Sequence, residues 1–184
     1  MSQRAFFLDR DGTINVEKNY LFKVEDWEWT PRAIDAIKLI NNAGYLAIVV
    51  SNQAGIARGY YTDNDVQTLH VEVDRMLAKF DAKIDAYYYC PHHPEFGNPG
   101  NCHCRKPHPG MFLQAQADFK IDFDRSYMIG DKLIDAQAAI NAGVKPALVR
   151  TGYGKASEND AASTLAYYDN LYEAVAELLI DNNE

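Results

Sequence analysis

The sequence contains no long apolar run and few cysteines. Its longest apolar stretch, Tyr45 to Val50, is far shorter than the roughly 20 residues of a membrane-spanning helix. The N-terminal residues lead directly into a strand-like run and do not resemble a signal peptide. The three cysteines all lie between positions 90 and 104, which argues against a secreted disulfide framework. We therefore expect a cytoplasmic protein with no membrane partner.

Positive charge is also scarce. The formal net charge is −8 and the isoelectric point is about 5.1, whereas a nucleic-acid-binding domain usually carries a basic face. We therefore expect no nucleic-acid partner, and an anionic ligand must be met by a local group of cations. Its length of 184 residues and ample apolar content predict one domain over residues 1–184. We expect this domain to act as a monomer, although the sequence itself does not determine the oligomeric state. The candidate cations are Arg58, Arg105, Lys106 and Lys132.

Short β-rich runs alternate with helical patterns along the chain. Strands separated by helices predict parallel crossovers, and therefore an α/β, Rossmann-like, mostly parallel sheet with helices on both faces. Residues 90–109 interrupt this rhythm as a loop insertion, and no segment is long enough for a large cap domain. Strands are expected at residues 5–8, 45–50, 86–89, 127–129, 146–149 and, more weakly, 165–168. Helices are expected at 30–44, 62–80, 110–119, 132–142 and 171–180.

Acidic and hydroxyl side chains directly follow the predicted strands. Asp9 and Asp11 follow the first strand, Ser51 the second and Asp131 the fourth. Ligands bind beyond the carboxyl ends of parallel strands, so we expect these groups to meet at one sheet edge. There a carboxylate can attack the phosphorus of a phosphate monoester while a second acid protonates the leaving oxygen. Two carboxylates and a phosphate repel one another, which predicts a hard divalent cation such as Mg2+.

The loop insertion offers metal ligands of another kind. Its pattern C-x-H-x9-C-x-C supplies four ligands of the types that zinc prefers. Buried free thiols are the alternative, but their clustering in one loop favours a zinc site. The four residues are Cys90, His92, Cys102 and Cys104, and spacing alone leaves His93, His103 and His108 as rival nitrogen donors.

Taken together, the motifs resemble the haloacid dehalogenase superfamily over nearly the whole chain. Asp9-Arg10-Asp11-Gly12-Thr13 looks like its first motif and Ser51 its second, while Lys106 resembles the third and Gly130-Asp131 with Asp135 the fourth. The longer stretches 51–59, 90–94, 104–111 and 130–133 look like the heptose 1,7-bisphosphate phosphatases within that superfamily. Histidinol-phosphate phosphatase domains share the Cys-rich loop.

This resemblance implies removal of the 7-phosphate of a heptose 1,7-bisphosphate through an aspartyl-phosphate, a step in lipopolysaccharide-heptose synthesis. Asp9 would be the nucleophile and Asp11 the acid/base, and Ser51 and Lys106 would hold the phosphoryl group. Mg2+ would bind the carboxylates of Asp9 and Asp131 and the backbone carbonyl of Asp11.

The resemblance also assigns the remaining ligands. Zinc would bind Cys90, His92, Cys102 and Cys104, so the family pattern selects His92 among the rival histidines. The substrate-contacting positions carried over are Glu17, Lys18, Asn19, Tyr20, Ser51, Asn52, Gln53, Ala54, Arg105, Lys106 and Lys132.

Several alternatives remain open on the sequence. The activity could be that of a histidinol-phosphate phosphatase, or the zinc loop could belong to a non-catalytic module that binds a partner protein. A nucleic-acid 3′-phosphatase fits the acidic balance poorly. Asp135 is either a partner of the metal site or an exposed helix acid, and Arg58 is either a ligand or a surface charge.

Overall fold

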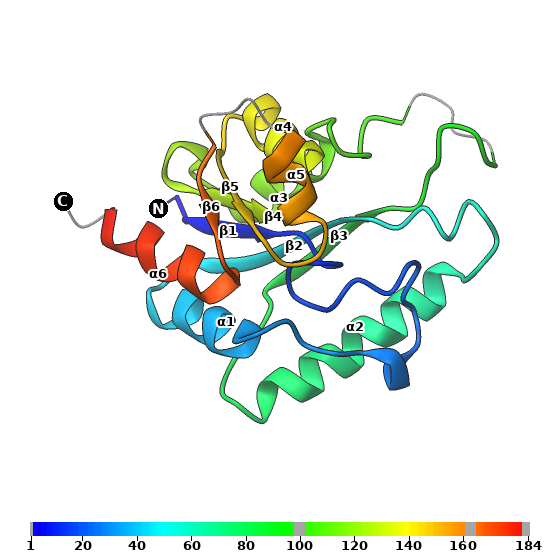
Figure 1. Cartoon of the computed structure of the whole chain (residues 1–184), viewed down its shortest axis with the longest axis horizontal. Coiled ribbons are helices and arrows are strands. Elements are labelled where there is room, and N and C mark those ends of the chain that lie inside the picture. The colour runs from blue at the N-terminus through cyan, green and yellow to red at the C-terminus, as the bar shows by residue number, and fades with distance from the viewer. Residues whose placement is uncertain (1, 98–101, 161–164, 182–184) are drawn as a thin grey trace.

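A parallel six-stranded sheet runs through the middle of the molecule (Figure 1). The computed structural model describes residues 2–97, 102–160 and 165–181. The strand order is β3-β2-β1-β4-β5-β6, and every neighbouring pair is parallel. The strands are β1 (Ala5–Leu8), β2 (Leu46–Asn52), β3 (Ala86–Cys90), β4 (Tyr127–Gly130), β5 (Lys145–Val149) and β6 (Tyr167–Tyr168).

Helices cover both faces of this sheet, which confirms the predicted α/β class. One face carries α1 (Ala33–Asn42), α2 (Asp63–Ala78) and α6 (Leu171–Asp181), as Figure 1 shows. The other carries α3 (Gly110–Phe119), α4 (Leu133–Ala142) and α5 (Gly154–Asp160). Two short 3-10 turns, η1 (Val24–Asp26) and η2 (Phe123–Arg125), lie in the connections. Within the described residues no cap domain stands over the sheet edge.

The core lies on the two sides of β1. Phe6 and Leu8 pack into the cluster under α1, α2 and α6, whereas Ala5 and Phe7 pack into the cluster under α3 and α4. All four side chains are fully buried. A strand covered on both faces has to be apolar at every position, which is why residues 5–8 show no alternation.

The strand order places the predicted site residues together. β1 lies between β2 and β4, so the crossovers from β1 diverge at this point and leave a crevice at the carboxyl ends. The backbone N–H of Asp9 donates to the carbonyl of Ile129 (2.9 Å), which brings the ends of β1 and β4 side by side.

Some predicted boundaries are wrong. The helix expected from Thr30 begins at Ala33, because Thr30 Oγ1 donates to the Thr13 carbonyl (2.6 Å) and Arg32 adopts a left-handed φ of 60°. The helix expected at 62–80 ends at Ala78, and Phe80, which lies beyond its end, is 50% exposed. Helix α5 was not predicted from the sequence.

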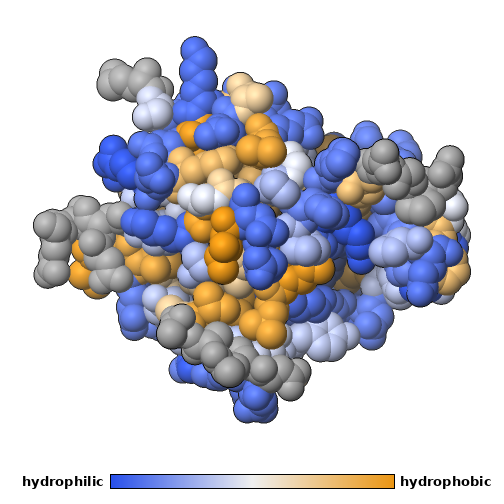
Figure 2. All heavy atoms as spheres, turned by 90° about the horizontal axis from the view of Figure 1, so that it is seen from above, coloured by the Kyte–Doolittle hydropathy of each residue, from blue (hydrophilic) through white to orange (hydrophobic). Residues whose placement is uncertain are grey.

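The outer surface over α3, α4 and α5 mixes apolar and hydrophilic side chains (Figure 2). Its exposed apolar members include Leu113 of α3 and Ile140 of α4, about half exposed. No helix in the described part of the chain is both long and apolar enough to cross a membrane.

Candidate active site

A cavity of about 420 Å³ lies at the carboxyl ends of β1, β2 and β4. Most residues predicted to contact substrate line it: Glu17, Asn19, Tyr20, Ser51, Asn52, Gln53, Ala54, Arg105, Lys106 and Lys132. Asp9, Asp11 and Asp135 line it as well. The exception is Lys18, whose ammonium group pairs with Glu28 (3.1 Å) away from the cavity. The fold therefore gathers residues that are distant in sequence around one space.

Lys106 is the central cation of the cavity floor. Its ammonium group contacts Asp9 Oδ1 (2.7 Å) and Asp135 Oδ1 (2.6 Å) and donates to the Val50 carbonyl (2.8 Å). Burial alone would lower the pKa of Lys106, but the charges of Asp135 and Asp9 raise it, so the ammonium group stays protonated. Asp135 is 1% exposed, so the sequence alternative of an exposed helix acid is wrong.

Asp131 has one carboxylate oxygen engaged and one without a protein partner. Oδ2 accepts from the backbone N–H of Tyr153 (2.8 Å), whereas the buried Oδ1 has no hydrogen-bond partner. Glycines make room for this group: a Cβ at Gly12 or Gly152 would lie 2.2 or 2.3 Å from Asp131 Oδ2. A buried oxygen with no donor is costly, which favours a cation at this position.

The carboxylates of Asp9, Asp131 and Asp135 crowd one another. Oxygens from all three lie within 4.8 Å of one another. Burial raises the pKa of Asp9 to about 7 against the opposing Lys106 charge, and the neighbouring carboxylates add to the increase. Burial also raises the pKa of Asp131 to about 6. One lysine does not balance three buried carboxylates, and an all-oxygen donor set suits Mg2+.

Unlike these three carboxylates, the Asp11 carboxylate is surrounded by hydrogen-bond donors. Arg10, which is 1% exposed, donates from Nη2 to Asp11 Oδ1 and Oδ2 (both 2.9 Å). Asn15 and Gln53 donate to the same carboxylate at 3.0 Å. Burial would raise the pKa of Asp11, but the Arg10 charge and these hydrogen bonds together hold it below its usual value. Asp11 is therefore ionised in this arrangement.

Two amide side chains hold Ser51 and Lys106 in place. Gln53 donates to Ser51 Oγ (2.7 Å) and accepts from the Tyr61 hydroxyl (2.7 Å). Asn52 forms two hydrogen bonds with the backbone of Lys106, through Oδ1 (3.0 Å) and Nδ2 (3.1 Å). Asn52, predicted as a substrate contact, thus also anchors the segment that carries Lys106.

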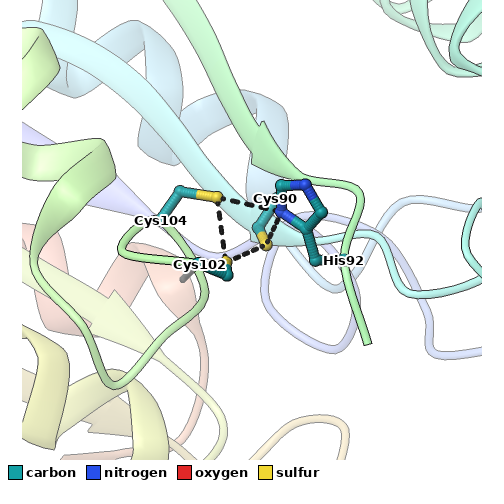
Figure 3. A group of neighbouring side chains, drawn as sticks. All are labelled: Cys90, His92, Cys102 and Cys104. Carbon is teal, nitrogen blue, oxygen red and sulfur yellow. Dashed lines mark hydrogen bonds between the residues drawn. The ribbon is translucent and has the colours of Figure 1, made fainter. Parts of the chain in front are cut away.

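The Cys/His cluster lies beside this cavity, and Figure 3 shows its four side chains converging. Cys90 Sγ lies 3.5 Å from His92 Nδ1 and from Cys102 Sγ. Cys104 Sγ lies 3.4 Å from Cys102 Sγ and 3.5 Å from His92 Nδ1. These are four of the six distances among the donor atoms, and a regular tetrahedron with such edges has corners about 2.1 Å from its centre, close to zinc bond lengths of about 2.0–2.3 Å. The donor set therefore fits zinc, although residues 98–101 of the predicted loop lie outside the described residues.

The cluster is joined directly to the cavity. Arg105 follows Cys104, and its Nη1 donates to the His92 carbonyl (3.1 Å) while its backbone N–H points at Cys102 Sγ (3.4 Å). Lys106 comes next in the chain. Any shift of the cluster would therefore move Arg105 and Lys106, two of the three cations that line the cavity.

Sequence reasoning missed several residues of the site. Arg10 and Asn15 hold Asp11, Tyr61 holds Gln53, Tyr153 bonds Asp131, and His93 lines the cavity. The position of Arg10 between two acids was a usable signal, because a buried arginine requires a carboxylate partner. Nothing in the local pattern marks Tyr61 or Tyr153.

Comparisons with known proteins agree with this geometry. A family model described as HAD-hydrolase-like matches residues 103–174. A D-glycero-beta-D-manno-heptose-1,7-bisphosphate 7-phosphatase from Escherichia coli O6:H1 is 49% identical over 154 residues, covering 80% of each chain. The enzyme of that name from Yersinia pestis is 43% identical over 166 residues, covering 86% of this chain and 87% of its own.

Solved structures give the same result. The D,D-heptose 1,7-bisphosphate phosphatase of B. bronchiseptica, complexed with magnesium and phosphate, superposes with a TM-score of 0.89 and 30% identity. The match covers 97% of this chain and 99% of that one. The resemblance therefore extends through the whole fold, and includes the strand ends that form the cavity.

Proposed function

This chain belongs to the haloacid dehalogenase-like hydrolases, in the family of the heptose bisphosphate phosphatases, and from that premise we propose that it removes the 7-phosphate of D-glycero-D-manno-heptose 1,7-bisphosphate. The observation that carries the proposal is the arrangement of Asp9, Lys106 and Asp131 at the junction of β1 and β4, with one buried oxygen of Asp131 unpartnered. The product would feed lipopolysaccharide-heptose synthesis.

The proposed chemistry has two steps. An Asp9 carboxylate oxygen attacks phosphorus, the bond from phosphorus to the sugar oxygen breaks, and Asp11 gives that oxygen a proton. A water molecule then attacks the aspartyl-phosphate, Asp11 takes the proton of the water, and inorganic phosphate leaves with Asp9 restored. Lys106 holds the phosphoryl group beside Asp9, and Ser51 donates a hydrogen bond to it.

Asp11 must be protonated when the leaving oxygen departs. Its pKa is lowered by Arg10 in the arrangement described above. A phosphoryl group entering the cavity brings negative charge close to Asp11 and so raises that pKa. The approach of the substrate therefore favours the protonated form that the first step needs.

The chain has residues to bind both metal ions. The carboxylates of Asp9 and Asp131 and the backbone carbonyl of Asp11 would bind Mg2+, which supplies positive charge to balance the acids and the phosphoryl group. Cys90, His92, Cys102 and Cys104 would bind zinc, and four protein ligands leave no open position for chemistry.

The two remaining cations of the cavity support a substrate with a second phosphate. Arg105 and the exposed end of Lys132 both line the cavity, and Lys132 Nζ lies 3.3 Å from Glu17 Oε2. Because these cations line the same cavity as Asp9 and Lys106, they can bind the distal phosphate of a sugar bisphosphate.

A phosphate-release assay with a panel of phosphorylated sugars and histidinol phosphate tests the proposal. We expect kcat/KM for heptose 1,7-bisphosphate to exceed that for histidinol phosphate by at least about tenfold. Equal or reversed preference would favour a histidinol-phosphate phosphatase. Activity that persists after thorough removal of divalent ions, or that calcium supports as well as magnesium, would contradict the metal assignment.

We propose that residues 1–184 act as one domain and as a monomer in the cytoplasm. The first and last strands of the described chain belong to a single sheet, which supports one folding unit. Cysteines gathered as metal ligands rather than paired as disulfides suit a reducing compartment.

A further inference from the structure

The loop after β1 is held in a strained conformation where it lines the cavity. Asn19 and Tyr20 are consecutive non-glycine residues with φ of 51° and 64°. Side chains larger than hydrogen rarely adopt this region, and such strain persists only where the surroundings enforce it. Tyr20 is also 41% exposed, so burial in the core does not hold it in place.

Arg58 contacts this loop from a separate part of the chain. It lies on the loop after β2, and its guanidinium lies 5.8 Å from the centre of the Tyr20 ring. The same guanidinium lies 4.1 Å over the Phe96 ring, and its Nη2 is 3.0 Å from Nε2 of His93. Tyr60, two residues further along, packs edge to face on Tyr20 at 4.9 Å. One cation thus joins three loops.

Two of the residues that Arg58 contacts, Tyr20 and His93, line the cavity, whereas Arg58 and Phe96 do not. His93 receives a hydrogen bond from the Glu95 backbone N–H at Nδ1 (3.0 Å) and packs edge to face on Phe96 at 4.9 Å. Its ring therefore contacts the Cys-rich loop on one side and Arg58 on the other. Tyr20 and His93 lie in the outer part of the cavity, away from the buried Asp9.

We propose that Arg58 is a positioning residue that sets the places of Tyr20 and His93, and thereby selects substrates by the part of the leaving group beyond the phosphoryl centre. The inference rests on the proposed function in one respect, that this leaving group is a sugar phosphate. Without a cap domain, the outer part of the cavity is lined by loops, and the loop that carries Asn19 and Tyr20 forms one side of it.

The kinetic test compares two substrates in Arg58→Met. Heptose 1,7-bisphosphate reaches the outer cavity, whereas acetyl phosphate, with its small leaving group, contacts only the inner residues. We expect KM for the bisphosphate to rise by about tenfold with kcat within about threefold, and kcat/KM for acetyl phosphate to stay unchanged. Equal losses on both substrates, or no loss on either, would overturn the proposal.

Two further variants complete this comparison. Arg58→Lys keeps the charge without the planar group, so its KM should fall between those of the wild type and Arg58→Met. Arg4→Met is the matched control, because the Arg4 guanidinium lies 4.2 Å over the Tyr45 ring at the far end of β1. Arg4→Met should leave KM for both substrates unchanged.

Amide hydrogen exchange tests the positioning role without any substrate. In Arg58→Met the amides of residues 17–20 and 93–97 should exchange faster, while those around Lys106 should not. Unchanged exchange in both loops would overturn the proposal even if the protein proves to act on another phosphate ester. A wild type that does not hydrolyse the bisphosphate, with exchange altered as expected, would count against the proposed function alone.

Discussion

The two candidate metal sites of this molecule are built in opposite ways. The carboxylate site draws Asp9, Asp131 and Lys106 from three distant segments, and all three side chains are buried. The thiol site draws its four ligands from residues 90–104, and three of these are partly exposed. The first is fixed by the sheet before any metal binds, whereas the second joins short loop segments that have little core of their own.

This difference suits the carboxylate site to catalysis and the thiol site to holding the loop in its folded conformation. A site fixed by the sheet and left with one free buried oxygen can bind a cation and still admit substrate. A site with four protein ligands is complete in itself, so its metal orders the loop. Changes in the first should therefore act mainly on turnover and leave the fold intact, whereas changes in the second should impair folding as well.

The largest effect should come from Asp9→Asn. We expect kcat to fall by at least about 10⁴-fold, because the variant has no carboxylate to attack phosphorus. The zinc content should match that of the wild type and the melting temperature should not fall, since Asn removes a buried charge without disturbing the sheet. Phosphate release, thermal melting and elemental analysis measure the three quantities. Near-normal turnover would refute Asp9 as the nucleophile.

Asp11→Asn should be nearly as damaging. Loss of the proton donor should lower kcat on the sugar substrate by about 10²- to 10⁴-fold. With 4-nitrophenyl phosphate the leaving group needs no proton, so the first step should survive while hydrolysis of the aspartyl-phosphate stays slow. Rapid mixing should then show a burst of about one nitrophenolate per site. Absence of a burst in an otherwise slow variant would contradict the acid/base role.

Cys104→Ser should affect both turnover and stability. The variant should lose zinc, melt at a lower temperature and turn over about 10- to 100-fold more slowly, because Arg105 and Lys106 follow Cys104 directly. His103→Ala is the control, since His103 lies in the same loop but outside the cluster and should leave about one zinc per chain. A zinc-free protein with unchanged stability and kinetics would show that the loop has another purpose.

The prediction with the smallest effect on turnover concerns how the stability of the fold depends on pH when magnesium is absent. Burial raises the folded-state pKa of Asp9 to about 7 and of Asp131 to about 6, against 3.8 in the unfolded chain. Between these values the native state binds more protons, so its stability falls as pH rises from about 4 to about 7. With these two pKa values, we expect the free energy of unfolding to fall by roughly 3–4 kcal/mol between pH 5 and pH 7 in magnesium-free buffer.

Added magnesium should remove most of this dependence of stability on pH, because the cation displaces the protons from the same carboxylates. Asp9→Asn should also show a shallower slope than the wild type, since it lacks the group with the larger shift. The thiol site should respond in the opposite direction and lose zinc as pH falls, because its ligands are thiolates. Thermal melts and bound-zinc measurements across this pH range would separate the two sites.

Much of the fold and of the site could be predicted from local patterns. Fully apolar runs such as Ala5 to Leu8 require burial on both faces, so they indicate strands of a parallel sheet. Because such strands share one carboxyl edge, the positions of Asp9, Ser51 and Asp131 after them were enough to predict a common site. The metal ligands of the Cys-rich loop could also be predicted from the sequence, because all four lie within 15 residues of one another.

The amino-acid sequence by itself determined the α/β class, the acids at the strand ends and the four zinc-type ligands, because each depends on residues close together in the chain. The tertiary structure alone decided that Arg10 is buried against Asp11, that Lys106 bridges Asp9 and Asp135, and that Tyr153 bonds Asp131. It also decided that the helix after Thr30 starts late, because Thr30 bonds to the Thr13 carbonyl. All but the first of these contacts join residues at least 17 positions apart, and only the packing of the elements brings such partners within hydrogen-bond distance.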